Sequence, residues 1–371
     1  MAKAMKLEVP DRVPVMCQMS IGHMLLQTGL RPSEFWHSAD CFAEGLVRMR
    51  ERYAFDGILV SLHGHTPLWE KEVSRIEKQG GGEEIIWKNG DRTYCPNDDL
   101  PIHIPANPAP RPAFSDFDID SISQDLSFIP VSQGLEFRFD QAHPYDIFDF
   151  IEARCGDLYS IHGEVTSPFD YFLNLFGFEQ ALIGLLENPS KSKAVLERFS
   201  DAIAKTALAQ IDHGVDAIKI SSPFAGSGFI SPAYYKEFVV PYEGRIAKAV
   251  RGRGIPVYTH TCGAINDRLE MIVEAGVSGI ECLDPPPLGN VELGEAKKRI
   301  GEKAFIKGNI DPVNIMLFGD LEAVKKDAIA RIETGKQGGG YILSTACSIA
   351  PHTKREHIQI LSALADQYGA D

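Results

Sequence analysis

The residues best suited to chemistry are a histidine and a cysteine two positions apart in the stretch 256–263, Pro-Val-Tyr-Thr-His-Thr-Cys-Gly. Its apolar first half predicts a strand, so His260 and Cys262 project from the same face, because alternate side chains of a strand share a side. A second apolar run, 340–346, ends at Cys347. Imidazole nitrogen and thiolate sulfur are good zinc ligands. The three residues therefore predict one zinc site with an open coordination position.

A His-x-Cys pair alone is weak evidence for a metal site, because a free cysteine often serves as a small buried hydrophobe. The place of the three residues in the fold has to decide between these interpretations. The remaining cysteines are interpreted as packing residues: Cys17, Cys41, Cys95, Cys155 and Cys282.

Composition narrows the class of protein. The 371 residues are 44% hydrophobic and 24% charged, which is typical of a globular chain. A net charge of −14 argues against nucleic acid or an anionic membrane surface as a partner. The apolar runs are too short to span a bilayer, and the first residues lack the apolar core of a signal peptide. Together with the scattered cysteines, this leads us to expect a cytoplasmic protein without nucleic-acid or membrane partners.

Apolar runs alternate with helical patterns along most of the chain, including helical patterns over 32–55 and 168–187. The strand candidates are 12–19, 57–62, 159–165, 216–222, 256–262, 279–283, 304–310 and 341–346. Eight alternating units predict one α/β domain over 1–371, a (β/α)8 barrel. The alternative, an open doubly wound sheet, lacks a Gly-x-Gly-x-x-Gly turn after its first strand.

Residues about 66–141, after the second strand candidate, break this alternation. Asn89-Gly90 lies between two short apolar runs and predicts a hairpin, and a proline-rich tract follows it. The segment has too little apolar periodicity for a core of its own. We interpret it as an inserted hairpin and loop segment that covers part of the C-terminal rim and borders the opening without sealing it.

Active sites of such barrels lie where the strands end, at their carboxyl ends. This places His260, Cys262 and Cys347 at one rim, together with Glu164 at the end of the third strand candidate. Glu164 is the candidate fourth metal ligand and catalytic residue, and His162 is the alternative ligand.

Further polar residues end at the same rim. We expect four of them to bind substrate: His63, His65, Glu281 and Asn309. Asp284 and Asp311 are interpreted instead as helix caps or acceptors for loop amides.

Five stretches carry a family resemblance: 10–15 (Pro-Asp-Arg-Val-Pro-Val), 163–169 (Gly-Glu-Val-Thr-Ser-Pro-Phe), 260–263, 308–312 and 347–353. With them the chain resembles the uroporphyrinogen decarboxylase superfamily, and most closely its zinc-dependent methyltransferase branch. The resemblance implies a barrel in which His260, Cys262 and Cys347 bind zinc and Glu164 supplies a carboxylate ligand.

The decarboxylase itself fits less well. Its early motif carries arginines that bind substrate carboxylates, whereas the corresponding stretch 16–23, Met-Cys-Gln-Met-Ser-Ile-Gly-His, has none. A substrate with eight carboxylates needs such cations. The decarboxylase also needs no metal, which would leave the three soft donors without a role.

A zinc ion with one exchangeable ligand can activate a thiol, or act as a Lewis acid on the heteroatom that carries a methyl group. We expect a zinc-dependent methyltransferase that moves a methyl group between a small substrate and the cobalt of a corrinoid. A methyl ether such as a methoxylated aromatic is favoured over methanol, a methylamine or a thiol acceptor. Aromatic and imidazole residues near the rim favour a flat substrate: Trp69, Tyr94, His63, His65, Phe224 and Phe229.

No Asp-x-His-x-x-Gly motif for corrinoid binding is present, so we expect a separate corrinoid protein to bring the cobalt (cobalamin) cofactor. Two alternatives remain. The first is a decarboxylase-like lyase acting on a smaller carboxylic acid, which would contain no stoichiometric zinc. The second is a non-enzymatic docking partner of a corrinoid protein, whose zinc would have no exchangeable ligand.

Overall fold

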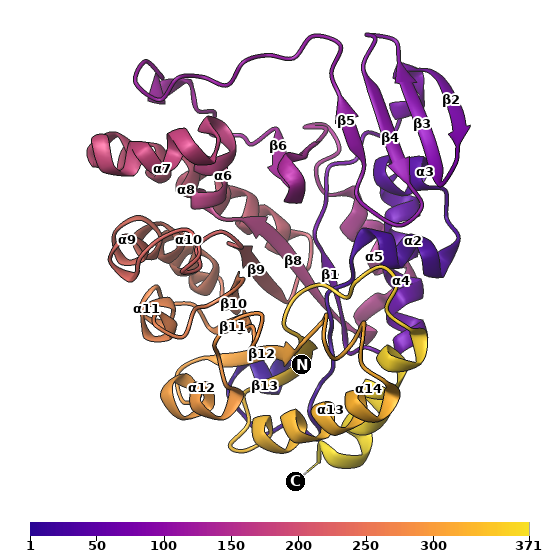
Figure 1. The fold of residues 1–371 in the computed structure, drawn as a ribbon, viewed down its shortest axis with the longest axis vertical. Coiled ribbons are helices and arrows are strands. Elements are labelled where there is room, and N and C mark those ends of the chain that lie inside the picture. The colour runs from indigo at the N-terminus through magenta and orange to yellow at the C-terminus, as the bar shows by residue number, and fades with distance from the viewer. Residues whose placement is uncertain (371) are drawn as a thin grey trace.

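Seven parallel strands curl around the centre of the structure, a computed structural model that describes residues 1–370 (Figure 1). Neighbouring strands follow the chain order, and every pair between them is parallel. The strands are β1 (Gly57–Val60), β8 (Ser160–Thr166), β9 (Ala217–Ser221), β10 (Val257–Thr261), β11 (Gly279–Cys282), β12 (Phe305–Ile310) and β13 (Tyr341–Thr345).

An extended N-terminal segment lies between β13 and β1. Val15 forms a parallel bridge with Leu343, and its carbonyl accepts a hydrogen bond from Asp56 N at 2.9 Å. Its own N–H donates to the Asp56 carboxylate at 2.7 Å, and Pro14 has no N–H to donate. The predicted (β/α)8 barrel is therefore confirmed, with a first strand that is reduced to isolated bridges.

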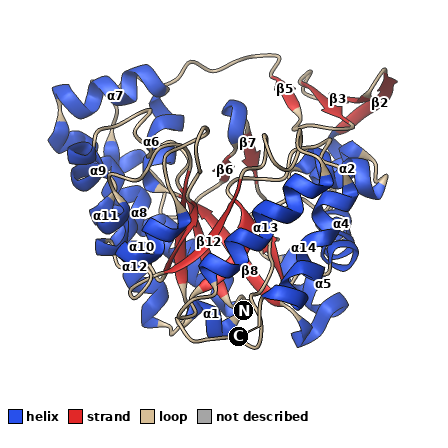
Figure 2. Ribbon diagram, turned by 60° about the horizontal axis from the view of Figure 1, so that its bottom comes forward, coloured by secondary structure: helices blue, strands red, loops and turns tan. Residues whose placement is uncertain are grey.

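Helices surround the strands, while α1 and the N-terminus lie at the end of the barrel opposite the inserted sheet (Figure 2). The helices are α1 (Ala2–Met5), α2 (Ile21–Thr28), α3 (Pro32–His37), α4 (Ala39–Tyr53), α5 (Asp146–Cys155), α6 (Pro168–Phe176), α7 (Phe178–Glu187), α8 (Pro189–Asp212), α9 (Pro232–Phe238), α10 (Val240–Gly252), α11 (Leu269–Glu274), α12 (Leu293–Ile300), α13 (Leu321–Gly335) and α14 (Arg355–Tyr368).

Two predicted helices are each divided into two. The helix expected over 32–55 breaks at Ser38, whose extended backbone ends α3 and whose hydroxyl accepts from Cys41 N at 3.3 Å to cap α4. The helix expected over 168–187 breaks at Gly177, where φ is +77°. That conformation is open to glycine at little cost, so the chain turns there between α6 and α7.

The inserted segment forms two small antiparallel sheets above the barrel (Figure 1). Their strands are β2 (Val73–Gln79), β3 (Gly82–Trp87), β4 (Arg92–Pro96) and β5 (Ile102–Ile104), with β6 (Phe128–Pro130) and β7 (Glu136–Arg138). Short 3₁₀ helices are η1 (Trp69–Glu72), η2 (Ile119–Ser121), η3 (Ser132–Gly134) and η4 (Gly156–Leu158). The predicted turn at Asn89-Gly90 joins β3 to β4.

The main core lies between the strands and the helices that cover them, and a small separate cluster of Trp69, Ile85 and Cys95 lies under the inserted sheet. Within residues 1–370, no helix combines the length and apolar character needed to cross a bilayer.

Candidate metal centre

Three soft donors from two strand ends meet at the C-terminal rim. The Nε2 atom of His260 lies 3.1 Å from the sulfur of Cys262, which lies 3.9 Å from the sulfur of Cys347. All three donor atoms lie within 4.8 Å of one another. In a tetrahedral zinc site with bonds of about 2.0–2.3 Å, neighbouring ligand atoms are roughly 3.3–3.8 Å apart. The donors therefore fit such an ion in both chemistry and spacing.

The loop after β10 is held by a carboxylate. Gly263 has a φ of +78°, and its N–H donates to Asp284 at 2.6 Å. Asp311 accepts from the N–H groups of Val313 and Asn314, each at 2.8 Å. Both aspartates thus serve as acceptors for loop amides, as expected, and Asp284 fixes the loop that follows the first two donors.

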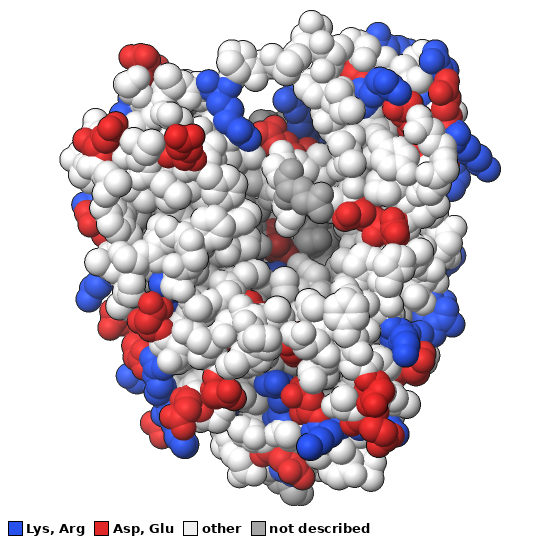
Figure 3. Space-filling model, viewed as in Figure 1, with Lys and Arg blue, Asp and Glu red and all other residues white. Residues whose placement is uncertain are grey.

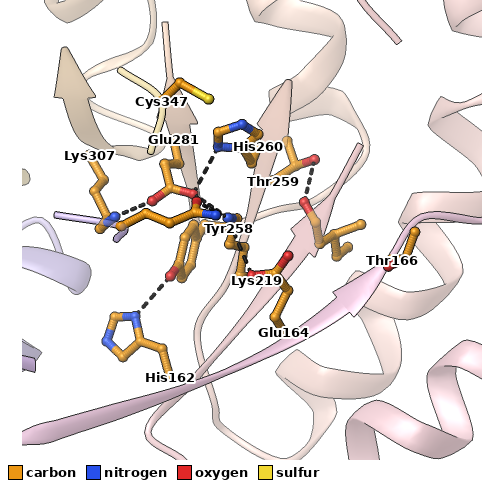
Figure 4. A network of polar contacts seen from close by, with 12 residues as sticks. His162, Glu164, Thr166, Lys219, Tyr258, Thr259, His260, Glu281, Lys307 and Cys347 are labelled. Carbon is orange, nitrogen blue, oxygen red and sulfur yellow. Dashed lines mark hydrogen bonds and ion pairs between the residues drawn. The ribbon is translucent and has the colours of Figure 1, made fainter. Parts of the chain in front are cut away.

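Glu281 orients the histidine of the cluster (Figure 4). His260 Nδ1 lies 3.0 Å from Glu281 Oε2, which leaves Nε2 directed toward Cys262. The same buried carboxylate pairs with Lys307 and lies 3.1 Å from Lys219 Nζ. Burial alone would raise the pKa of Glu281, but the two lysines and the bond from His260 hold that pKa well below its usual value. The carboxylate is fully engaged inside the protein, so its expected substrate-binding role is not supported.

The cysteines at this rim differ in their pKa values. Hydrogen bonds from Cys282 and Cys347 lower the pKa of Cys262 to about 5, so its sulfur is a thiolate at neutral pH. The bond to Cys262, followed by burial, raises the pKa of Cys347. Cys282 was expected to be a packing residue, but its sulfur forms a second group of donor atoms with Cys262 and Asp284. It lies beside the metal candidates.

The backbone beside Cys282 is strained. Cys282 and Leu283 have φ values of +85° and +54°, in the left-handed region that residues with a side chain seldom adopt. Such strain persists only where the surroundings enforce it, and it is common next to functional sites. Here it lies at the turn that directs Asp284 toward Gly263.

The structure does not bring the two candidates for a fourth ligand into the cluster. Glu164 Oε2 lies 3.4 Å from Lys219 Nζ and lacks a hydrogen-bond partner among the described residues. His162 lies deeper, with its ring nitrogens 2.9 Å from the Tyr258 hydroxyl and 3.1 Å from the Ser160 hydroxyl (Figure 4). Burial lowers the pKa of His162 to about 3. Its nitrogens are already engaged away from the thiols, whereas Glu164 lies at the rim and lines the pocket there.

His63 and His65 are buried and do not line the pocket at the barrel rim. His63 Nδ1 is 3.0 Å from the carbonyl of Pro144, and the His65 ring packs against Phe42 and Phe137. Burial lowers the pKa of His63 to about 4 and that of His65 to about 3. Both rings are therefore neutral packing groups, which corrects the expectation that they bind substrate.

Asn309 also has a structural role. Its Nδ2 donates to the carbonyls of Leu283 at 2.7 Å and Val291 at 3.3 Å, and its Oδ1 accepts from Arg331. The side chain is fully buried, so it ties strand ends together instead of contacting substrate.

A pocket of about 320 Å³ lies between the barrel rim and the inserted segment. Figure 3 shows the surface hollowed between the region of α6 and α7 and the β2–β5 sheet. Its aromatic walls are Trp36, Phe178 and Phe224, and its floor includes Glu164, Asp170, Ser221 and Ser348. Ser348 follows Cys347 directly, and Ser221 is the register partner of His260. The pocket lining therefore includes neighbours of the donors, while His260, Cys262 and Cys347 are not among the described lining residues.

Of the aromatic and imidazole residues expected near the substrate, only Phe224 lines this pocket among the described residues. Trp69 instead packs in the small cluster under the inserted sheet, and Phe229 lies outside the pocket against Phe224. Within the described lining, Arg111 is the one lysine or arginine. The described lining thus combines aromatic rings with hydroxyls and carboxylates and holds a single basic side chain.

Two buried lysines of the site were missed from the sequence. Lys219 and Lys307 lie in the otherwise apolar strands β9 and β12 and are fully buried. A lysine in a buried strand is rare unless it is paired, so this pattern is a usable signal of an internal charge network.

The chain resembles known proteins in sequence. The family described as uroporphyrinogen decarboxylase (URO-D) matches residues 133–368. Methylcobamide:CoM methyltransferase MtaA of Methanosarcina barkeri is 26% identical over 220 residues, which cover 59% of this chain and 62% of MtaA. The uroporphyrinogen decarboxylase of Ruthia magnifica is 25% identical over 350 residues, 82% of this chain and 94% of that protein. The match to MtaA therefore spans less than two thirds of its length.

The fold also matches a solved structure. A methyltransferase from Methanosarcina mazei superposes with a TM-score of 0.72, over 99% of this chain and 97% of that one. At 19% sequence identity, this likeness concerns the fold alone.

Proposed function

This chain belongs to the uroporphyrinogen decarboxylase (URO-D) family, and we propose that it is a zinc-dependent methyltransferase. It would move a methyl group between a small substrate and the cobalt of a corrinoid held by a separate protein. The observation that carries the proposal is the meeting of His260, Cys262 and Cys347 beside an open pocket. Relatives named methylcobamide:CoM methyltransferases support it.

We assign the metal to the three donors, with Glu164 as an exchangeable fourth ligand. Zinc bound there would supply a Lewis acid that stabilises negative charge on the heteroatom that loses the methyl group. Glu281 holds the His260 ring in place. Glu164 lines the pocket and is the carboxylate that substrate would displace.

The favoured substrate is a methyl ether such as a methoxylated aromatic. A pocket of about 320 Å³ suits a small molecule, and the rings of Trp36, Phe178 and Phe224 provide flat apolar contacts. Burial raises the pKa of Asp170 to about 8, so this pocket residue is a neutral hydrogen-bonding group at pH 7. Methanol, a methylamine or a thiol acceptor are the other candidates. The inserted segment is proposed to border the opening through which the corrinoid protein reaches the bound substrate.

A lyase acting on a smaller carboxylic acid is the second candidate, because the decarboxylase relative aligns over 82% of the chain. Against it, the described lining contains a single basic side chain, that of Arg111. Decarboxylation would also leave three clustered soft donors without a role.

The test combines metal analysis with an assay of methyl transfer. Protein purified without chelator should contain about one zinc per chain. Reduced cobalamin should become methylated when it is added with one member of a panel of methoxylated aromatics, methanol and methylamines. Cys262→Ala should abolish this reaction. Turnover that is equal without any corrinoid would reject the proposal and favour the lyase.

A further inference from the structure

Lys219 lies at the centre of a buried polar network beside the metal candidates (Figure 4). Its side chain is 1% exposed, and its Nζ lies 2.6 Å from Gln18 Oε1, 3.1 Å from Glu281 Oε2 and 3.4 Å from Glu164 Oε2. Gln18 accepts a hydrogen bond from this ammonium group, and both carboxylates lie within ion-pair distance of it. Lys219 thus connects the carboxylate that orients His260 to the carboxylate that faces the pocket.

Glu164 depends on this lysine in the structure. Its side chain is 11% exposed, and its Oε2 has no hydrogen-bond partner among the described residues. A buried carboxylate without a partner is strongly unfavourable, because it loses its hydration without compensation. The ammonium of Lys219 is the positive charge placed to offset that loss.

The charges of the network balance when Glu164 lies beside Lys219. Lys219 and Lys307 contribute two positive charges, and Glu164 and Glu281 contribute two negative charges. The network is therefore neutral without any contribution from Glu164 to a metal. A divalent zinc ion bound by two thiolates is also neutral, so the network and the metal site together carry no net charge.

We infer that Lys219 is the positioning residue that holds the Glu164 carboxylate whenever that carboxylate is not a metal ligand. The inference rests on the proposed function, in which substrate displaces Glu164. Lys219 competes with the metal for the same carboxylate, so it keeps one coordination position exchangeable. Without the lysine, the displaced carboxylate would have no partner and would return to the metal.

The test uses zinc release from the full chain to an excess of chelator, together with the visible spectrum of the cobalt(II)-substituted protein. Lys219→Met should slow zinc release, because Glu164 stays on the metal. Lys307→Met is the matched control, since Lys307 is equally buried and pairs with Glu281 but forms no ion pair with Glu164 among the described residues. Zinc release from Lys219→Met should be about tenfold slower than from Lys307→Met, because only Lys219→Met removes the ion pair that competes with the metal for Glu164.

A double variant isolates the role of Glu164. In a Glu164→Gln background, Lys219→Met and Lys307→Met should release zinc at equal rates, and the cobalt spectrum should no longer respond to Lys219→Met. Substrate should change the cobalt spectrum of the wild type but not that of Lys219→Met. Lys219→Gln, which keeps a hydrogen-bonding group beside Gln18, provides a second variant if Lys219→Met does not fold.

The outcomes separate this inference from the proposed function. Wild-type protein without stoichiometric zinc would reject the proposed function. Wild-type protein that binds zinc, with equal release rates in Lys219→Met and Lys307→Met, would overturn the role of Lys219 alone. A difference between these variants that persists in the Glu164→Gln background would also overturn it, because the effect would then not involve Glu164.

Discussion

The Nδ1 atom of His260 lies 3.0 Å from Oε2 of Glu281, so the carboxylate determines which ring nitrogen is available. With Nδ1 donating its proton to Glu281, Nε2 is the ring nitrogen that faces Cys262, 3.1 Å away, and it is the one left for a metal. A histidine that binds a metal is commonly held by a carboxylate in this way, which fixes its tautomer and makes it a stronger ligand. The pair supports a metal-binding role for His260.

Glu281→Gln should weaken zinc binding by about 10- to 100-fold. The amide still fits beside His260, but it lacks the negative charge that strengthens the imidazole as a ligand. Competition against a zinc-sensitive fluorescent chelator measures the effect. Glu270→Gln is the control, since Glu270 pairs with Arg299 on the outside of the barrel. Equal zinc affinity in the wild type and Glu281→Gln would show that Glu281 does not tune the ligand.

Cys262→Ala and Cys347→Ala should each lose bound zinc while the barrel remains folded. Each change removes one of the two thiolates, and the remaining thiolate and imidazole, with only the exchangeable Glu164 beside them, are too few for a stable site. Elemental analysis gives the zinc content, and circular dichroism reports the fold. Cys155→Ala serves as the control, because this buried cysteine ends α5 away from the cluster. Full zinc occupancy in either ligand variant would refute the assignment.

The alternation of apolar runs and helices was sufficient to predict the barrel, and the strand ends then placed the three soft donors together. These features depend on local periodicity and on one topological rule, so the sequence contains them. The reduction of the first strand to isolated bridges was not predictable from the sequence. It depends on the N–H of Val15, which donates to the Asp56 carboxylate and not to a backbone carbonyl.

The roles of the polar residues at the rim were less predictable. His63 and His65 follow β1 as expected, but the inserted segment buries both rings, and no local pattern shows how that segment folds over them. Glu281 was placed at the correct strand end, yet its function depends on neighbours from other strands, Lys219 and Lys307. Contacts between distant strands decide such roles.

Glu243→Gln should reduce the amount of stability that the protein loses as pH rises from 5 to 8. Burial raises the pKa of Glu243 from 4.5 to about 7, although Thr259 donates a hydrogen bond to it at 3.0 Å. The folded state therefore keeps a proton that the unfolded state releases above about pH 4.5. Its contribution to stability is complete below that pH and is lost as pH rises through about 7.

A pKa change of this size corresponds to about 3 kcal/mol in the free energy of unfolding. Glutamine cannot release a proton, so this part of the pH dependence should disappear. Urea unfolding of both proteins at pH 5 and pH 8 measures the difference. Glu237→Gln, an exposed change on α9, should leave the wild-type pH dependence intact. An unchanged pH dependence in Glu243→Gln would show that this carboxyl does not titrate as described.

Phe224→Ala should raise KM for a methoxylated aromatic by about tenfold, with a smaller effect on kcat. Phe224 lines the pocket and packs edge-on against Phe178, with ring centroids 4.8 Å apart. Losing one aromatic wall removes apolar contact with the substrate, and about 1.4 kcal/mol of lost contact corresponds to a tenfold change. The donor atoms and Glu164 are untouched, so the chemical step should be largely preserved.

Phe229→Ala is the matched control for this prediction. Phe229 packs against Phe224 at 5.2 Å but is 43% exposed and does not line the pocket, so its removal should leave KM nearly unchanged. Methanol and methylamine are too small to contact the aromatic wall, and their kinetic constants should not respond to Phe224→Ala. If the pocket selects a flat aromatic ring, only Phe224→Ala should raise KM, and only for methoxylated aromatics. Equal effects of the two phenylalanine changes, or an effect on methanol as large as that on the aromatic, would show that the pocket does not select a flat ring.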